Sequence, residues 1–152
     1  MRTVAGIGLL IATTVLASCG AKSSGTPQAS TASASSAESR YDVGPRAGEQ
    51  PIHEAQVATG EKLFKSKGCS ACHAFGRKLS CPDLNGVTMR RTAQWMENQI
   101  LHPEVMTRED PISHALFAQY SLQMPNQKLT PEETRSIIEF LKHKNHEATE
   151  SR

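Results

Sequence analysis

The stretch Cys69-Ser70-Ala71-Cys72-His73 constrains this chain more than any other. It has the form Cys-x-x-Cys-His, through which a protein binds haem by two thioether bonds and supplies a histidine ligand to the iron. Two thiols at this spacing can reach the two vinyl groups on one edge of the porphyrin, and the adjacent imidazole of His73 then lies under the iron. A Cys-x-x-Cys pair alone could also be a redox dithiol or half of a zinc site. The histidine that follows, and the absence of a second such pair in the sequence, favour one covalently bound haem c.

Residues 1–18 have the organisation of an export signal. Arg2 precedes an apolar segment, residues 4–17, that is too short to be read as a membrane-spanning helix. The stretch Leu16-Ala17-Ser18-Cys19 resembles the bacterial lipobox, which implies cleavage before Cys19 and acylation of its sulfur and amine. Stable anchoring needs more than one acyl chain, because each buried CH2 contributes only ~0.8 kcal/mol. We expect an exported protein, lipid-anchored to a bacterial membrane and facing the periplasm; the alternative is an ordinary secretory signal with a chance cysteine.

The next segment, residues 19–51, is predicted to be a tether. Residues 20–40 consist mainly of Ser, Ala, Gly and Thr, and several glycines and prolines extend the irregular composition to residue 51. A segment with so little apolar bulk cannot offset the entropy lost on ordering, so its composition predicts disorder. A flexible coil of this length would hold the following domain on the order of 30 Å from the membrane.

The rest of the chain predicts an all-α domain, residues 52–145, followed by a frayed tail, residues 146–152. Apolar spacing and end signals indicate four helices, at residues 54–67, 92–101, 110–120 and 130–144. The last helix has the clearest start, with Thr130 as N-cap, Pro131 at the first position and Glu133 completing a capping box. The core these helices can build is thin for about 95 residues, so a bound haem would supply apolar surface for them to cover.

Residues 60–141 resemble the class I c-type cytochrome domain. The shared features are the Gly-x-x-x-Phe pattern of Gly60 and Phe64 in the first helix, the haem motif, and a last helix that crosses the first. In addition, Cys81-Pro82-Asp83-Leu84 matches most of a Gly-Pro-x-Leu pattern that follows the haem motif in this family. The resemblance implies a cytochrome c-like fold of three to five helices around a covalently bound haem, with the first and last helices crossed.

The resemblance also implies roles for single residues. The carbonyl of Pro82 would accept a hydrogen bond from Nδ1 of His73, which leaves Nε2 to bind the iron, and Leu84 would pack on the porphyrin. The chain departs from the family pattern at Cys81, where glycine or alanine is common. With Cys19 assigned to lipid and the haem motif to haem, Cys81 is left over: it is either a reactive or disulfide-forming thiol, or, as we favour, a small buried thiol near the haem.

The second axial ligand of the iron decides what such a site does. A thioether raises the reduction potential relative to a second imidazole, and an empty position would admit gases or peroxide. The candidates are Met89, Met96, Met106, Met124, His102 and His114. Met96 is expected in the core, Met89 follows the Pro82 loop closely, and Met106 is expected in a loop. Met124 precedes a proline in an extended segment and matches the family's distal Met-Pro position, so it is the predicted ligand, with Met106 as its rival.

The charge is nearly balanced. The formal net charge is +2 and falls by one when Arg2 leaves with the leader, so no field strong enough to attract nucleic acid is expected. The basic pairs Arg77-Lys78 and Arg90-Arg91 are either docking sites for an acidic partner or, as we favour, solvated surface.

Together these features predict a membrane-tethered monohaem electron carrier, not an enzyme, that works between respiratory-chain proteins through a haem ligated by His73 and Met124. A short similarity of residues 110–130 to small cytochromes of denitrification chains adds denitrification enzymes to the candidate partners. The alternatives are a five-coordinate haem protein that binds gases or peroxide, and a thiol–disulfide module built on Cys69 and Cys72.

Overall fold

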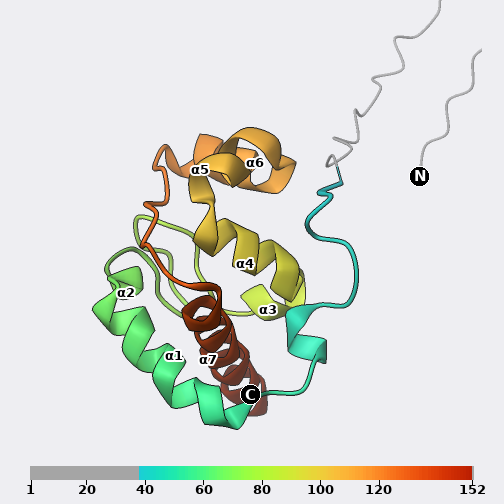
Figure 1. Cartoon of the computed structure of the whole chain (residues 1–152), viewed down its shortest axis with the longest axis vertical. Coiled ribbons are helices and arrows are strands. Elements are labelled where there is room, and N and C mark those ends of the chain that lie inside the picture. Colours follow the sequence, from blue (N-terminus) through green and yellow to red (C-terminus); the bar gives the residue numbers. More distant parts are fainter. Residues whose placement is uncertain (1–37, 152) are drawn as a thin grey trace, which may run out of the picture. The chain divides into compact units, whose positions relative to one another are not determined.

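The protein folds into helices joined by irregular segments (Figure 1). The computed structural model describes residues 38–151, so the predicted leader, Cys19 and residues 20–37 lie outside the described part. Within residues 38–151 every regular element is helical, which confirms the predicted all-α class. The elements are η1 (Ala47–Glu49), α1 (Glu54–Ser66), α2 (Cys69–Cys72), α3 (Val87–Arg90), α4 (Ala93–Leu101), α5 (Pro103–Glu109), α6 (Pro111–Tyr120) and α7 (Pro131–Glu150). None of these helices is long and apolar enough to span a bilayer.

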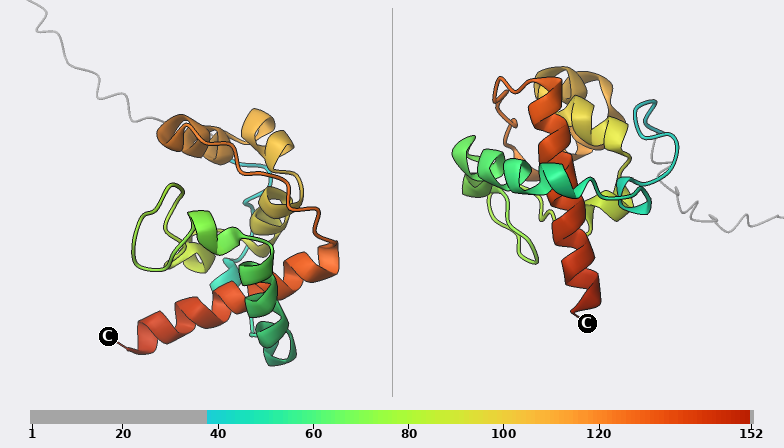
Figure 2. Two further views of the ribbon diagram at one scale, coloured as in Figure 1. Left: turned by 90° about the vertical axis from the view of Figure 1, so that its left-hand side faces the viewer. Right: turned by 60° about the horizontal axis from the view of Figure 1, so that its bottom comes forward.

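Helices α1 and α7 cross in close contact, as both views in Figure 2 show. The crossing point is Gly60, where a Cβ atom would come within 1.9 Å of the Ser136 carbonyl oxygen and 2.9 Å of the Phe140 Cβ. One turn further along α1, the ring of Phe64 packs against that of Phe140 with 5.4 Å between centroids. The Gly-x-x-x-Phe pattern of Gly60 and Phe64 therefore marks where the two helices meet.

Helix α7 begins as predicted but ends later. Thr130 Oγ1 accepts a hydrogen bond from the Glu133 amide, and the Glu133 carboxylate accepts one from the Thr130 amide, which completes the capping box. The predicted frayed tail at residues 146–152 is wrong, since the helix continues to Glu150. The reason is Asn145, a buried side chain that accepts hydrogen bonds from Thr88 and donates one to the carbonyl of Leu84, which holds this part of α7 against the domain.

Three short α-helices, α2, α3 and α5, were not predicted, and two of them carry candidate methionine ligands. Helix α5 occupies the segment expected to be a loop around Met106, and Met106 is buried at 1% exposure in the core. Pro103 at its first position sets φ for a helical start, and the Thr107 hydroxyl donates to the Pro103 carbonyl. Helix α3 carries Met89, which is exposed. Both elements are too short for apolar periodicity to be recognised.

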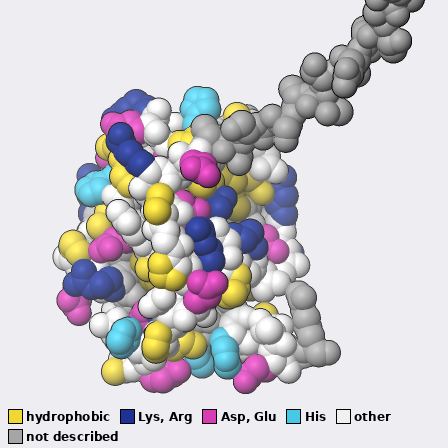
Figure 3. Space-filling view, turned by 90° about the vertical axis from the view of Figure 1, so that its right-hand side faces the viewer, with side chains coloured by type: hydrophobic (Ala, Val, Ile, Leu, Met, Phe, Trp, Pro, Cys, Tyr) yellow, Lys and Arg dark blue, Asp and Glu magenta, His cyan; other side chains and the backbone are white. Residues whose placement is uncertain are grey.

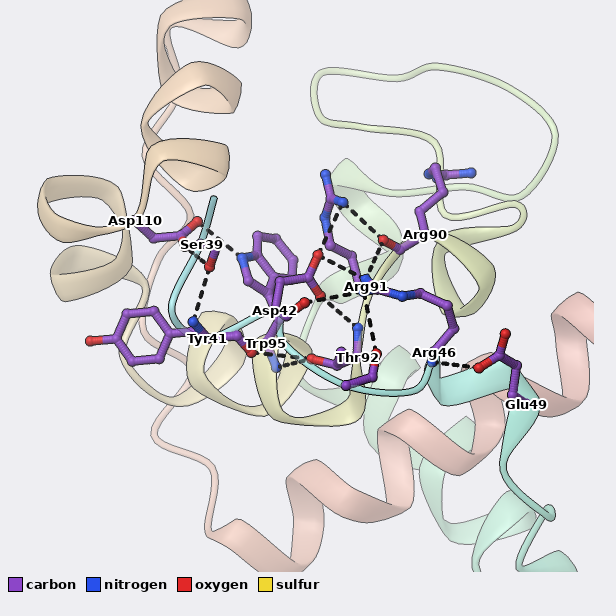
Figure 4. Close-up of polar contacts among 11 residues, drawn as sticks. Ser39, Tyr41, Asp42, Arg46, Glu49, Arg90, Arg91, Thr92, Trp95 and Asp110 are labelled. Carbon is purple, nitrogen blue, oxygen red and sulfur yellow. Dashed lines mark hydrogen bonds and ion pairs between the residues drawn. The ribbon is translucent and has the colours of Figure 1, made fainter. Parts of the chain in front are cut away.

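Residues 38–50 form an arm that packs on the domain, so the predicted tether ends too late. The side of the domain on which this arm lies carries basic and acidic side chains interspersed (Figure 3). Asp42 is the centre of the polar contacts drawn in Figure 4: its carboxylate accepts a 2.7 Å hydrogen bond from the Thr92 amide and pairs with Arg46 and Arg91. The side chain of Ala47 is fully buried. The arm is therefore part of the domain.

The arm has a second attachment near its start. The hydroxyl of Ser39 donates a hydrogen bond to the buried carboxylate of Asp110. The other oxygen of Asp110 accepts from the Trp95 indole at 3.0 Å and from the Ser113 amide at 2.8 Å. Asp110 thus caps α6 and also joins the arm to α4.

Replacing Gly60 with alanine tests the helix crossing. The alanine would gain up to ~1 kcal/mol in helix propensity, but its methyl group would meet backbone that cannot move freely, so the clash outweighs the gain. We expect the free energy of unfolding to fall by about 2–3 kcal/mol in denaturant titrations. The exposed residue Thr59 on the same helix gives the matched control, since Thr59→Ala should change stability by less than about 0.5 kcal/mol. Equal effects of the two substitutions would contradict the crossing described.

Candidate functional site

A cavity of about 190 Å³ lies at the centre of the domain, between α1, α4, α6 and α7 and the segments that connect them. One buried water needs only about 10–15 Å³ by the same measure. Its walls are mostly apolar and include Phe64, Leu84, Ile100, Leu129, Ile137 and Leu141. Protein interiors are close-packed, so an apolar cavity of this size is a binding space and not a packing defect.

The structure brings most of the predicted site residues to this cavity. Its walls include Cys69, His73, Pro82, Leu84 and Met124, which come from widely separated parts of the sequence. Cys72 is half-buried at the end of α2, the same turn that contains Cys69. The predicted lipidation site, Cys19, lies outside the described residues.

The backbone around the cysteine motif explains how its side chains are presented. Gly68 adopts a left-handed conformation with φ of 77°, which ends α1 and redirects the chain into the single turn of α2. Cys69 and Cys72 are three residues apart in this turn, so their side chains lie on the same side of it. His73 then leaves the helix in extended conformation, with φ of −114° and ψ of 143°, and its side chain reaches the cavity.

The imidazole of His73 is held by one hydrogen bond. Its Nδ1 lies 2.8 Å from the carbonyl oxygen of Pro82, the contact that the family resemblance implied. A carbonyl oxygen only accepts, so the proton belongs on Nδ1 and the lone pair of Nε2 stays free. Burial lowers the pKa of His73, with the Pro82 hydrogen bond acting in the opposite direction. The ring is therefore a neutral imidazole with one fixed tautomer, the form that binds metals.

Met124 reaches the cavity from the segment between α6 and α7. Two amide side chains fix this segment: Asn126 donates to the carbonyl of Leu101 at 3.0 Å, and Gln123 donates to that of Pro103 at 3.2 Å. Both bonds run to the corner between α4 and α5. The thioether of Met124 is thus held at the cavity wall by contacts on either side of it in the sequence.

Gln99 is a site residue that no sequence pattern indicates. It lies on α4, lines the cavity, and its Nε2 is 3.8 Å from the Sδ of Met124, within reach of a weak N–H···S hydrogen bond. Its Oε1 is buried and has no hydrogen-bond partner within residues 38–151. A single glutamine on a helix belongs to no motif, so only the three-dimensional arrangement identifies it.

The other candidate axial ligands lie elsewhere. Met106 lies in helix α5, is buried in the core, and does not line the cavity. The predicted loop around Met106, on which its candidacy as an axial ligand depended, is therefore wrong. Met96 is buried in α4 as predicted, although it also borders the cavity. Met89, His102 and His114 are exposed and are not among the wall residues.

Cys81 is a buried free thiol at the cavity wall. Its amide donates to the carbonyl of Cys72 at 3.2 Å, which fixes the short loop that follows His73. Burial raises the pKa of the Cys81 thiol, and the neighbouring thiol of Cys72 raises it further. A protonated, buried thiol is a poor nucleophile, so the structure favours the buried-thiol interpretation over a reactive one.

These residues fit a covalently bound haem. Two thiols lie on one helical turn beside a neutral imidazole with a free Nε2, and a thioether borders the same cavity. The apolar walls suit a large, flat, apolar group. This donor set matches the chemistry that the Cys-x-x-Cys-His motif predicts.

Comparisons with known proteins agree with the site. Residues 57–145 match the family model described as cytochrome c. Cytochrome c-551 of Ectopseudomonas mendocina is 30% identical over 84 residues, covering 55% of this chain and 95% of that protein. A shorter match, 47% identical over 36 residues, covers 24% of this chain and 44% of cytochrome c-551 of Azotobacter vinelandii. The solved structure of a cytochrome c from Rhodothermus marinus superposes with a TM-score of 0.61 at 32% identity, covering 65% of this chain and 84% of that one.

The low reactivity of Cys81 can be measured by alkylation. In the folded protein we expect iodoacetamide to modify Cys81 at least roughly tenfold more slowly than in the unfolded chain at the same pH, because the raised pKa reduces the thiolate fraction. The rate should increase as the pH rises toward that pKa. Peptide mass spectrometry gives the extent of labelling, and the guanidinium-unfolded protein is the control. Equal rates in the folded and unfolded states would rule out the buried-thiol assignment.

Proposed function

Because the chain belongs to the cytochrome c family, we propose that it is a lipid-anchored electron carrier whose haem iron is ligated by His73 and Met124. Like other members it carries one covalent haem c, is not an enzyme, and works with redox proteins as partners. The haem supplies an iron centre that gains or loses a single electron. The protein attaches it, orients its ligands and excludes water.

The observation that carries the proposed ligation is that His73 and Met124 border the same apolar cavity. The Pro82 carbonyl orients the imidazole of His73 and keeps its Nε2 unprotonated. Such a second contact to a ligating histidine raises its basicity and fixes the ring. The two side chains come from segments that are held by separate hydrogen bonds.

Gln99 supports Met124 over the other methionines. Its Nε2 contact leaves one lone pair of the sulfur occupied by a weak hydrogen bond and the other free to bind iron. The contact also restricts the rotation of a side chain that is otherwise flexible. None of the other candidate methionines has such a partner within residues 38–151.

The proposed membrane tether rests on the lipobox-like sequence of residues 16–19, and the arm sets where the tether would end. The arm begins to pack on the domain at Ser39, so the segment available as a tether is residues 20–38. As a flexible coil this length would reach on the order of 25 Å. We propose that the protein is exported and held at a bacterial membrane through Cys19, close to membrane-bound respiratory or denitrification enzymes that donate and accept its electrons.

Substitution of Met124 tests the ligation. Ferric haem with histidine and methionine ligands has a weak near-infrared charge-transfer band, which Met124→Ala should abolish while the covalent haem is retained. Met89→Ala, at an exposed methionine, is the control and should keep the band. If the band persisted in Met124→Ala, the assignment would fail. Carbon monoxide binding by the ferrous wild type would favour the five-coordinate alternative.

Gln99→Leu extends this test. Loss of a residue that supports a metal ligand typically lowers metal affinity by 10–100-fold, so we expect imidazole to displace Met124 at roughly tenfold lower concentration. Gln94→Leu on the exposed side of the same helix is the matched control and should leave the titration unchanged.

Cys19→Ser tests the anchor. The variant should appear in the soluble periplasmic fraction without acyl mass, whereas Cys81→Ser, a cysteine substitution within the domain, should stay with the membrane. Membrane retention of Cys19→Ser would contradict lipid anchoring at this residue.

A further inference from the structure

Arg91 is a cation in the mostly apolar wall of the cavity. Within residues 38–151 the wall has two other side chains that are charged at neutral pH: Arg90, which is exposed, and Asp83, whose carboxylate is bound by two backbone amides. The side chain of Arg91 is 26% exposed, and its guanidinium carbon lies 5.1 Å from the centroid of the Trp95 ring, which also borders the cavity. Arg91 is therefore the more buried of the two arginines that line the cavity.

Asp42 of the arm is the counter-ion of this arginine. Its Oδ2 lies 3.4 Å from Nη1 of Arg91 and 2.9 Å from Nη1 of Arg46, and its Oδ1 accepts a 2.7 Å hydrogen bond from the Thr92 amide (Figure 4). The side chain of Asp42 is only 9% exposed, so the pair is weakly screened by solvent and salt. Burial lowers the pKa of Arg91, and Asp42 is the strongest of the charges that oppose this effect. A buried carboxylate thus pairs with a cation of the cavity wall.

The arm lies outside the part of the chain that matches the family model, residues 57–145. Membership of the family therefore assigns it no role. Its second attachment reaches the same wall: Ser39 donates a hydrogen bond to the carboxylate of Asp110, and the indole of Trp95 donates one to the other oxygen of that carboxylate. Both attachments of the arm therefore end at polar groups that border the cavity, the guanidinium of Arg91 and the indole of Trp95.

Charges beside the cavity bear on the electron that a haem site gains or loses. Reduction adds one negative charge to such a site, so a nearby cation favours the reduced state and a nearby carboxylate favours the oxidised state. Both effects are small at a solvated surface and larger where the charges are buried. A buried ion pair at the cavity wall is therefore placed to adjust the reduction potential.

We propose that Asp42 is a positioning residue for electron transfer: it holds the guanidinium of Arg91 against the Trp95 ring, balances its charge, and thereby lowers the reduction potential of the haem. This role rests on the proposed electron-carrier function, because the potential decides which redox proteins can donate electrons to the haem and which can accept them. The arm thus adjusts the site from outside the domain that the family shares.

The midpoint potential of the holoprotein, measured by spectroelectrochemical titration, tests this role. Asp42→Asn removes the charge but keeps an oxygen that can accept from the Thr92 amide. We expect it to raise the equilibrium constant for reduction roughly threefold, which is about 30 mV at 59 mV per tenfold for one electron. Arg91→Gln should lower the constant by a similar factor, and the double variant, which lacks both charges, should lie near the wild type.

Glu49→Gln is the matched control. Glu49 is an exposed acid of the same arm whose carboxylate accepts from the Arg46 amide, so the substitution removes one negative charge without removing a partner of Arg91. It should change the equilibrium constant less than about 1.5-fold. An effect equal to that of Asp42→Asn would overturn the proposal, since any charge on the arm would then act alike.

The opposite signs of the two single variants separate a charge effect from a loss of structure. If the arm only shielded the cavity from water, Asp42→Asn and Arg91→Gln would both lower the potential, and a shared direction of change would overturn the proposal. So would loss of the near-infrared band in Asp42→Asn, because the arm would then act on the ligation of the iron. Arg91→Gln is decisive by itself, since an unchanged or raised potential would contradict the role of its charge. A wild type without haem would instead reject the proposed function, and the role of Asp42 with it.

Discussion

The central constraint on this fold is the apolar cavity of about 190 Å³ that borders the hydrophobic core. Apolar walls that are not covered forgo the stabilisation of burial, roughly 25 cal/mol per Å² of apolar surface. Small domains have only about 5–15 kcal/mol of net stability. The covalent haem of the cytochrome c family therefore has a structural role here, because the surrounding helices need an apolar surface to pack against.

The turn of backbone that contains both cysteines also positions the imidazole of His73. Gly68 redirects the chain from α1 into the turn that contains both cysteines, and His73 follows in an extended conformation. The crossing at Gly60 holds α1 against α7, and the bond from His73 to Pro82 holds the ring. The position of the two cysteines, the orientation of the His73 ring and the packing of α1 are thus set by neighbouring residues of one segment. The segment that contains Met124 is held separately, by hydrogen bonds to the corner between α4 and α5.

The features that the sequence predicted correctly have local causes. The capping box at Thr130, the Gly-x-x-x-Phe pattern of Gly60 and Phe64, and the haem motif each lie within a few residues, where spacing alone carries the information. The features it missed depend on distant partners. Asp42 orders the arm through Thr92, and Asn145 extends α7 through Thr88. Helix α5 has seven residues, too few for a periodic pattern. Gln99 matters only because Met124 lies beside it.

The dependence of the fold on its haem can be tested most directly by comparing the holoprotein with a Cys69→Ala/Cys72→Ala variant that cannot attach it. Hydrogen exchange of the backbone amides of α1 and α7 is the measurement, with intact mass establishing one haem per chain in the wild type and none in the variant. We expect strong protection in the holoprotein and its loss in the variant, since the cavity would then be unfilled. Equal protection of the two helices in both proteins would show that the helices pack without the haem, and would contradict its structural role.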